Sequence, residues 1–355
     1  MRFCKLAAAA ASPLMLLAIA GVASGQTPTG TRLSGPLVHE NLAVYFIHGK
    51  SAPGKVPLTL DEALVRGAVQ VRETGDVNQL EIENRGNDEV FVQSGDIVKG
   101  GRQDRTLMVS LVLPPHSGRV PIASFCVEQG RWTARGNEDP TRFATASASV
   151  PSRELKLSMK APTQMPASPP VARPGVSPAL ASMDTGRRQQ EVWDAVRDTQ
   201  ARLNTSLGAQ VRSTQSASSL QLALENDKLA TAQRSYVDAI KAAGEAEDDI
   251  VGYVFAVNGT INSADVYPSN GLFRKMWGKL LDASAIEAIS HKDAAHADAP
   301  SIATVQAFLA AAETGKASEK PLNAGVRLTT RDAPAAYLFE TARADGWVHR
   351  NYLAK

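Results

Sequence analysis

The hydrophobic pattern of this chain changes period near its middle, and that change constrains the fold more than any other feature. Over residues 42 to about 127, short runs such as LAVYFI, QLEIE and EVFVQ alternate apolar with polar residues and are rich in β-branched side chains. Clusters of Gly, Asn, Asp and Pro separate them, as at turns between strands. After residue 187, apolar residues instead recur every three or four positions, which is the period of a helix. The sequence therefore predicts an α+β protein whose N-terminal part is a mainly antiparallel β unit.

Helices are expected to dominate the start of the second half. One is predicted over residues 187–207, where Gly208 follows as a stop, and a second over residues 218–243, with a cap at Ser218. Together these two would form a helical hairpin. Further helices are predicted after a cap at Ser269 or Asn270 and over residues 301 to about 313.

Turn and capping signals place other elements. Thr59 followed by Glu62 is typical of a capping box, so a short helix is expected within residues 58–64. Asn258-Gly259 lies between two alternating runs, and Asp345-Gly346 lies near the middle of another pair. Asn-Gly and Asp-Gly are strong signals of tight hairpin turns, so a β-hairpin is predicted at each position.

The chain is expected to divide into four segments. Residues 1–25 are predicted to be a signal peptide, residues 33–160 a β-rich half, and residues 187–355 an α+β half. Residues 161–186 form a Pro-rich linker or insertion, because the six prolines between 161 and 178 block both helix and central-strand hydrogen bonds. Whether the two halves are separate domains or one composite domain stays open.

The N-terminus has the three parts of a secretory signal. MRFCK is a short basic start, LAAAAASPLMLLAIAGV is an apolar run, and Ala23-Ser24-Gly25 supplies small residues for cleavage close after Gly25. An uncleaved anchor is the rival interpretation, but the run is Ala-rich, contains Pro13 and barely reaches bilayer length. The mature protein is therefore expected to be periplasmic or secreted, without a transmembrane anchor after cleavage.

Charge and composition narrow the class of protein. Hydrophobic residues make up 43% of the chain and charged residues 21%, which excludes a fully disordered protein. Loss of Arg2 and Lys5 with the signal peptide would bring the 38 basic residues level with the 36 acidic ones. Binding to nucleic acid usually rests on a basic excess, so no nucleic-acid partner is predicted.

One cysteine would remain in the mature chain. Cys4 leaves with the signal peptide, so Cys126 is alone in an oxidising compartment and has no intrachain partner. Free cysteines are among the most buried residues in proteins. We therefore expect Cys126 to be buried, with a reactive or interchain role as the alternative.

The loop over residues 94–107, SGDIVKGGRQDRTL, is the densest polar segment. Its two glycines can turn successive N–H groups toward one point while three basic side chains add positive charge, as in an anion-binding site. The candidate ligand-binding residues are Lys99, Gly100, Gly101, Arg102 and Arg105. The alternative is an exposed hairpin whose bases pair with Asp96 and Asp104, in which case removing an arginine would cost little stability.

A second polar segment, FCVEQGRW, spans residues 125–132. Cys126 and Glu128 are its weak catalytic candidates, and Arg131 is a further ligand-binding candidate. A nucleophilic thiol needs a base or a positive neighbour to form the thiolate, and the sequence does not show whether His116 or Arg131 approaches it.

Neither a metal site nor a cofactor site is predicted. The histidines form no i, i+4 pair and no HExxH motif, and the loop at 94–107 contains no phosphate-binding or dinucleotide-binding fingerprint. The six histidines are His39, His48, His116, His291, His296 and His349.

Several long segments resemble one known family. VFVQSGDIVKGGRQDRTL, LPPHSGRVPIASFCVEQGRW, SLQLALEN and VGYVFAVNGTINSADVYPSNGLFRKMWGKLL are similar, in this order, to the ARG and rhodanese-phosphatase-superfamily-associated protein domain. The resemblance covers most of residues 38 to 285 and implies a link to nucleotide or ADP-ribose systems. It transfers no catalytic residue, and residues 161–178 resemble a local insertion relative to the family pattern.

Two functions follow from these features. The first is an exported protein that binds or processes a small anionic ligand, such as phosphate, ADP-ribose or a nucleotide. The alternative is a non-enzymatic interaction or structural protein of the cell envelope. Gly, Arg, Asp and Glu cluster in two segments of the first half, which favours the first function. Whether the protein is an enzyme, and which protein partner it has, is left open.

Overall fold

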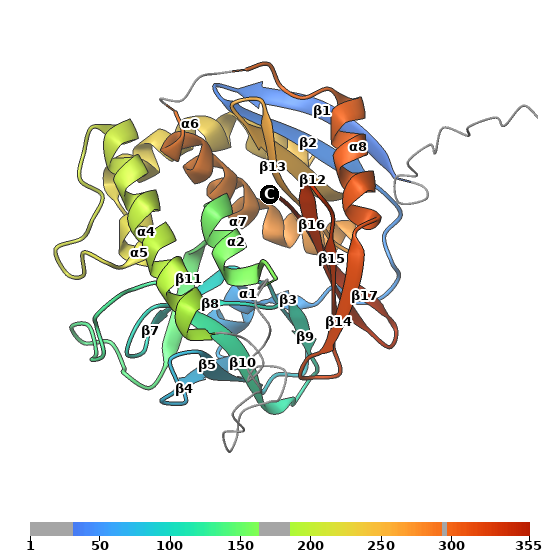
Figure 1. The fold of residues 1–355 in the computed structure, drawn as a ribbon. Helices are drawn as coiled ribbons and strands as arrows, with labels where there is room; N and C mark the ends of the chain where they lie inside the picture. The colour runs from blue at the N-terminus through green and yellow to red at the C-terminus, as the bar shows by residue number, and fades with distance from the viewer. Residues whose placement is uncertain (1–30, 163–184, 293–296) are drawn as a thin grey trace, which may run out of the picture.

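The chain is built around one large antiparallel sheet. The computed structural model describes residues 31–162, 185–292 and 297–355, and Figure 1 shows the large sheet above two smaller ones, with helices beside them. In the order of pairing, the large sheet contains β1 (Arg32–His39), β2 (Leu42–His48), β12 (Ile250–Val257), β13 (Thr260–Val266), β17 (Gly346–Ala354), β16 (Ala336–Arg343), β15 (Arg327–Asp332) and β14 (Lys316–Pro321). Because β2 pairs with β12, the two halves of the sequence share one sheet.

The two smaller sheets come from the first half of the chain. The six-stranded sheet contains, in order, β11 (Phe143–Ser149), β7 (Asp96–Gly100), β8 (Arg105–Leu107), β10 (Gly118–Cys126), β5 (Gln79–Asn84) and β4 (Val69–Glu73). The three-stranded sheet contains β3 (Leu58–Thr59), β6 (Val90–Val92) and β9 (Leu111–Leu113). Apart from the parallel pair of β3 with β6, the paired strands are antiparallel. The predicted α+β class and the mainly antiparallel N-terminal β unit are therefore confirmed.

Helices cover both faces of the large sheet. They are α1 (Leu60–Val65), α2 (Arg153–Lys160), α4 (Thr185–Leu207), α5 (Leu220–Leu224), α6 (Asp227–Gly244), α7 (Asn270–Ser290) and α8 (Ile302–Glu313). Helix α7 lies in the core and packs against β12, α6 and α4, whereas α8 packs against β16 and β1. Both faces of β12 are buried. Tyr253 and Phe255 belong to the hydrophobic core on the α7 side of the sheet. Val254 and Ala256 belong to the core on the α8 side. This double burial explains why the strand is apolar throughout.

Most of the local sequence signals are confirmed. Thr59 and Glu62 form the predicted capping box on α1, and Ser269 and Ser301 cap α7 and α8. Both predicted hairpins form, as β12 with β13 and as β16 with β17. These features depend on neighbouring residues alone, which is why the sequence predicts them.

Three predictions in the helical region were wrong. The helix predicted from Ser218 to residue 243 is two helices, because the side chain of Asn226 accepts hydrogen bonds from the N–H groups of Lys228 and Leu229 and starts α6 there. The cap of α5 is Ser219 instead of Ser218. Helix α6 also packs chiefly against α7, so α4 and α6 do not form a separate hairpin. Helix α2 was not predicted.

Two predicted segments fall outside this description. The signal peptide at residues 1–25 and most of the Pro-rich segment at 161–186 lie beyond the described residues. Among the helices of the described part, none has both the length and the apolar character required to cross a bilayer.

Candidate functional site

In the predicted anion-binding loop, carboxylate side chains of the protein itself accept hydrogen bonds from backbone N–H groups. The N–H of Gly100 donates to Oδ1 of Asp104 over 2.9 Å, and the N–H of Arg102 donates to Oε1 of Glu73 over 3.0 Å. Gly100 and Gly101 have positive φ values of 115° and 53°, and a Cβ on Gly101 would lie 2.4 Å from the Phe143 ring. Glycine is therefore required, but the N–H of Gly100 already binds a carboxylate of the same chain, and the N–H of Gly101 donates to the carbonyl oxygen of Arg142 over 3.0 Å.

The basic side chains of this loop are also paired. Lys99 contacts Glu225 at 2.7 Å. Arg105 is fully buried, with Glu73 at 3.4 Å and Gln103 at 3.1 Å. Only Arg102 is exposed among the three bases, and its guanidinium lies 5.4 Å from the centre of the Trp132 ring.

The two polar segments meet around a buried carboxylate pair. Arg131 contacts Glu128 at 2.7 Å and Asp104 at 3.7 Å, and Arg135 contacts Asp104 at 2.9 Å. The hydroxyl of Ser219 donates to Asp104 over 2.8 Å. Asp104 and Glu128 are both fully buried. Since each charge has a partner of opposite sign, this arrangement fits a structural ion-pair cluster better than a ligand site.

Cys126 lies inside the same cluster and is buried, as predicted. Burial raises the pKa of its thiol to about 11, against the opposing effect of Arg105. A thiol with this pKa carries little thiolate at neutral pH, and the thiolate is the nucleophilic form. The environment therefore fits a structural cysteine, and Glu128, engaged by Arg131, is not available as its base.

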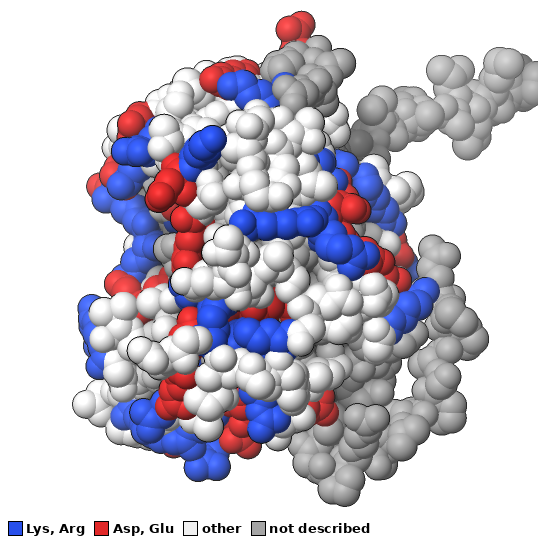
Figure 2. Space-filling model, turned by 90° about the vertical axis from the view of Figure 1, so that its left-hand side faces the viewer, with Lys and Arg blue, Asp and Glu red and all other residues white. Residues whose placement is uncertain are grey.

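Basic and acidic side chains also lie side by side on the surface near this region. Figure 2 shows the face that carries α4 and α5, with basic and acidic side chains interspersed over it. Neighbours such as Arg197 and Asp194 on α4 form ion pairs.

Within the described residues, groups of three histidine and carboxylate side chains lie close together at two other places. His48, Glu247 and Asp249 form one group, and Glu154, Glu287 and His291 form the second. The first group already contacts a cation, since Arg32 lies 3.0 Å from Glu247 and 3.4 Å from Asp249. In the second group, Glu154 contacts Arg202 at 3.4 Å and Arg153 at 3.5 Å. Because these guanidinium groups already supply positive charge, neither group supports a metal site.

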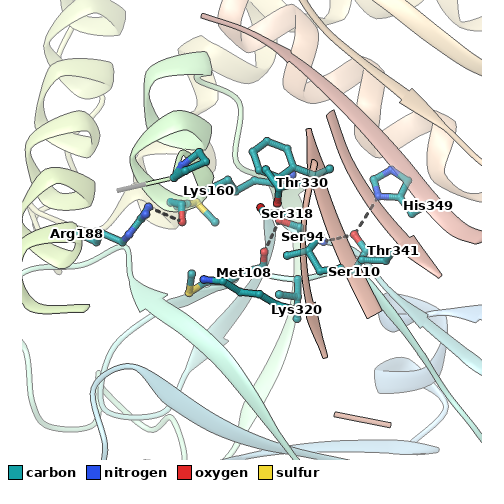
Figure 3. Close-up of a pocket in the computed structure, with 15 residues that line it drawn as sticks. Ser94, Met108, Ser110, Lys160, Arg188, Ser318, Lys320, Thr330, Thr341 and His349 are labelled. Carbon is teal, nitrogen blue, oxygen red and sulfur yellow. Dashed lines mark hydrogen bonds between the residues drawn. The ribbon is translucent and has the colours of Figure 1, made fainter. Parts of the chain in front are cut away.

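A cavity that the sequence did not predict has a different character. It has a volume of about 170 Å³ and lies between the end of α2, the start of α4 and strands β14 to β17 (Figure 3). Among the described residues, three cationic side chains line it, Lys160, Arg188 and Lys320, and no Asp or Glu of that part of the chain does. Its hydroxyl groups come from Ser94, Ser110, Ser318, Thr330 and Thr341. In the described part of the chain, hydrogen-bond donors thus surround the cavity.

Each cation is positioned by a different element. The guanidinium of Arg188 donates to the carbonyl oxygens of Ser158 and Met159 at the end of α2, at 3.3 Å each. Nζ of Lys160 donates to Oδ1 of Asn351 over 2.6 Å and lies 4.4 Å from the Phe339 ring. Lys320 projects from the exposed strand β14.

Behind the cavity a buried carboxylate organises the polar groups. Asp265 on β13 is 3% exposed, and its Oδ1 accepts from Nδ2 of Asn351 over 2.9 Å and faces Nε2 of His349 over 3.1 Å. Nδ1 of His349 in turn lies 3.0 Å from the hydroxyl of Ser110. A continuous network therefore runs from Ser110 through His349, Asp265 and Asn351 to Lys160.

Two shifted pKa values follow from this arrangement. Burial lowers the pKa of Lys160 to about 7, because the nearby charge of Asp265 offsets only part of the lost solvation and Lys156 adds repulsion. Burial also opposes ionisation of Asp265, but the hydrogen bond with His349 and the charges of Lys156 and Lys160 outweigh it, so the pKa of Asp265 lies below its usual value. The lysine can therefore gain or lose a proton near neutral pH beside a permanent carboxylate.

One buried polar atom beside the cavity lacks a partner. Thr341 lies opposite His349 in the pairing of β16 with β17, and its hydroxyl has no hydrogen-bond partner among the described residues. Buried hydroxyl groups are normally hydrogen-bonded. A ligand or water in the cavity would satisfy it.

Sequence reasoning missed these residues because their strands are distant in the chain. One signal was available: His349 and Asn351 are polar residues two positions apart within the otherwise strand-like run GWVHRNYLA, so they lie on one face. Asp265 is likewise a charge inside the predicted hairpin. Polar residues at strand positions that are expected to be buried indicate a specific polar contact or site.

The fold and the cavity define a class of protein, namely an α+β protein with a basic, hydroxyl-lined cavity above a buried carboxylate. The model of one family, the ARG and Rhodanese-Phosphatase-superfamily-associated Protein domain, matches residues 30–353. The chain therefore belongs to this family, and the match extends beyond the segments that first suggested it. No curated protein matches the sequence. No solved structure matches it either.

Proposed function

We propose that this protein binds a small anionic ligand in the cavity formed by α2, α4 and strands β14 to β17. One observation carries the proposal: within residues 31–162, 185–292 and 297–355, the cavity is lined by Lys160, Arg188 and Lys320 together with five hydroxyl side chains and by no carboxylate. The loop at residues 99–105 also carries basic residues, but the backbone N–H groups of Gly100 and Arg102 already bind carboxylates. The side chains of Lys99 and Arg105 also contact carboxylates, those of Glu225 and Glu73. We therefore propose the cavity, in place of the loop, as the anion site.

The size of the cavity limits the ligand. Pockets for drug-sized ligands usually measure about 300 to 1,000 Å³, whereas this one measures about 170 Å³. Inorganic phosphate or a small carboxylate would fit within it. A nucleotide or ADP-ribose would place only a phosphate group inside, with the rest of the molecule outside the mouth.

We also propose that the protein is exported. Support comes from the signal-like residues 1–25, which contain a basic start, an apolar run and small residues at the cleavage position. The intact mass of the protein recovered outside the cytoplasm tests this proposal, since cleavage close after Gly25 removes a defined segment. Recovery of the protein only inside the cytoplasm, with a mass that retains residues 1–20, would contradict it.

Binding is tested by calorimetric titration with phosphate, a small carboxylate and ADP-ribose, using two lysines of the same exposed strand. Lys320 lines the cavity and Lys316 does not, although both lie on β14. Loss of a charge-assisted contact costs about 1.5 to 3 kcal/mol, so Lys320→Met should weaken binding by roughly 10-fold to 150-fold. Lys316→Met should leave the affinity unchanged.

Two results would contradict the proposal. Binding of no anion by the wild-type protein would favour the alternative of a non-enzymatic interaction or structural protein. Equal weakening by the two lysine substitutions would show that overall charge attracts the anion without a site at this cavity.

A further inference from the structure

A hydroxyl and an imidazole line the cavity, and a carboxylate lies behind the imidazole. The Ser110 hydroxyl lies 3.0 Å from Nδ1 of His349, and Nε2 of His349 lies 3.1 Å from Oδ1 of Asp265. Asp265 accepts hydrogen bonds, so the proton of the neutral imidazole belongs on Nε2. Nδ1 is then free to accept the proton of the Ser110 hydroxyl, and one tautomer satisfies both contacts.

The imidazole is held rigidly in this orientation. Its ring stacks on Tyr267 at 5.0 Å between centres and meets the edge of Phe91 at 5.9 Å. Asn351 donates to the same carboxylate oxygen that faces His349, which fixes Asp265. The backbone N–H of Ser94 donates to the Ser110 hydroxyl over 3.0 Å and fixes the third member.

The three residues differ in whether they border the space open to a ligand. Ser110 and His349 line the cavity of about 170 Å³ (Figure 3). Asp265 instead borders an adjoining space of about 20 Å³, which is room for about one water molecule. The hydroxyl thus faces the ligand space while the carboxylate lies behind the imidazole. This is the arrangement in which a base activates a nucleophile and a third group orients the base.

We propose that Ser110 is the nucleophile of an ester-hydrolysing site, with His349 as its general base and Asp265 as the residue that positions His349. The substrate class is an ester of a small carboxylic acid whose acyl part enters the cavity. A negative charge on that acid would be held by Lys320 and Lys160, and this last point alone rests on the proposed anion binding.

The reaction balances with water as the second reactant. The Ser110 oxygen adds to the ester carbonyl carbon while His349 Nδ1 takes the hydroxyl proton. The bond to the leaving alcohol then breaks, and the alcohol takes that proton from His349. Water, deprotonated by His349, attacks the acyl-serine, the acid leaves, and Ser110 recovers its proton.

A matched serine on the surface provides a control. Ser235 also contacts a histidine, with 2.9 Å between its hydroxyl and Nε2 of His39, but this pair is exposed and lies outside the cavity. Treatment of the full-length protein with an alkyl fluorophosphonate, followed by intact-mass analysis and peptide mapping, should give a single adduct on Ser110. Ser235→Ala should be labelled at the wild-type rate, Ser110→Ala should not be labelled, and His349→Gln should react at least about 1,000-fold more slowly.

The positioning role of Asp265 has its own readout. In Asp265→Asn the side-chain amide can donate to Nε2, which moves the imidazole proton to Nδ1 and removes the base facing Ser110. Residual labelling should then rise about tenfold per pH unit, because only hydroxide removes the hydroxyl proton. A purely structural role would alter the melting temperature without changing the pH profile of labelling.

The outcomes separate this inference from the anion proposal. A folded wild-type protein that fluorophosphonate leaves unmodified at Ser110, or modifies equally in Ser110→Ala, overturns the serine inference even if phosphate binds. Hydrolysis of 4-nitrophenyl acetate that requires Ser110, with no preference for the anionic 4-nitrophenyl hydrogen succinate, supports the serine chemistry and contradicts the anion proposal. Loss of that preference in Lys320→Met, with acetate hydrolysis retained, supports both.

Discussion

Arg105 and Arg102 lie three residues apart in one loop, yet their replacement by alanine should have very different effects on stability. Arg105 has no exposed side-chain surface, and it contacts Glu73, Gln103 and the sulfur of Cys126. Removing it leaves Glu73, which is 6% exposed, as a buried carboxylate without this partner. Breaking a buried ion pair typically costs about 3 to 5 kcal/mol.

The matched change, Arg102→Ala, removes an exposed guanidinium. Its contact with the Trp132 ring is worth about 0.5 to 1 kcal/mol, and the hydrogen bond from its backbone N–H to Glu73 is retained. Urea unfolding followed by circular dichroism at neutral pH should therefore separate the two variants by at least about 2 kcal/mol. Combining Arg105→Met with Glu73→Gln should recover part of the loss, because no unpaired charge remains.

The reasoning would be refuted if Arg105→Ala and Arg102→Ala lost similar amounts of stability. It would also fail if Arg105→Ala cost less than about 1 kcal/mol, which is the range of an exposed pair. An exposed hairpin predicts that result for both arginines.

Two further predictions concern the cavity and the core. Lys160 has a pKa of about 7, so its positive charge is present below that pH and is lost as the pH rises through it. The affinity for acetate, whose own charge is constant over this interval, should therefore fall, and Lys160→Met should flatten the pH profile measured by titration. A Cβ on Gly244 would lie 2.3 Å from the Trp277 ring, whereas one on Gly278 of α7 would meet nothing within 4 Å. Gly244→Ala should therefore lower the free energy of unfolding by about 1 to 3 kcal/mol. Gly278→Ala should raise it by about 0.5 to 1 kcal/mol, and thermal unfolding measures both changes. A stabilised Gly244→Ala variant would contradict the close packing of α6 on α7.

Local features of this fold were predictable, and those that depend on distant pairing were not. The caps at Thr59, Ser269 and Ser301 involve residues a few positions apart. The break at Asn226 was missed because the apolar spacing continues across it, although its side chain can cap a new helix.

The contacts of the candidate site depend even more on residues that are distant in the sequence. The sequence identified the density of charge around residues 99–105, but not that Glu73 from β4 would neutralise it. The contact of Asp265 with His349 depends on the register of β13 against β17. The contact of Ser110 with His349 also depends on how the small sheet packs on the large one. Neither relation is encoded in a short segment.

The strand order of the large sheet also determines how long a buried strand lacks its partner while the chain is being synthesised. Strand β2 is completely buried and pairs on one side with β12, which follows roughly 200 residues later. At about 5 to 20 residues per second, translation would leave that apolar strand without this partner for roughly 10 to 40 s. During this interval the nascent chain exposes an unpaired strand edge, the kind of surface on which chains associate. A holding chaperone, or delivery to a translocase before folding, would suit a chain with this order of strands.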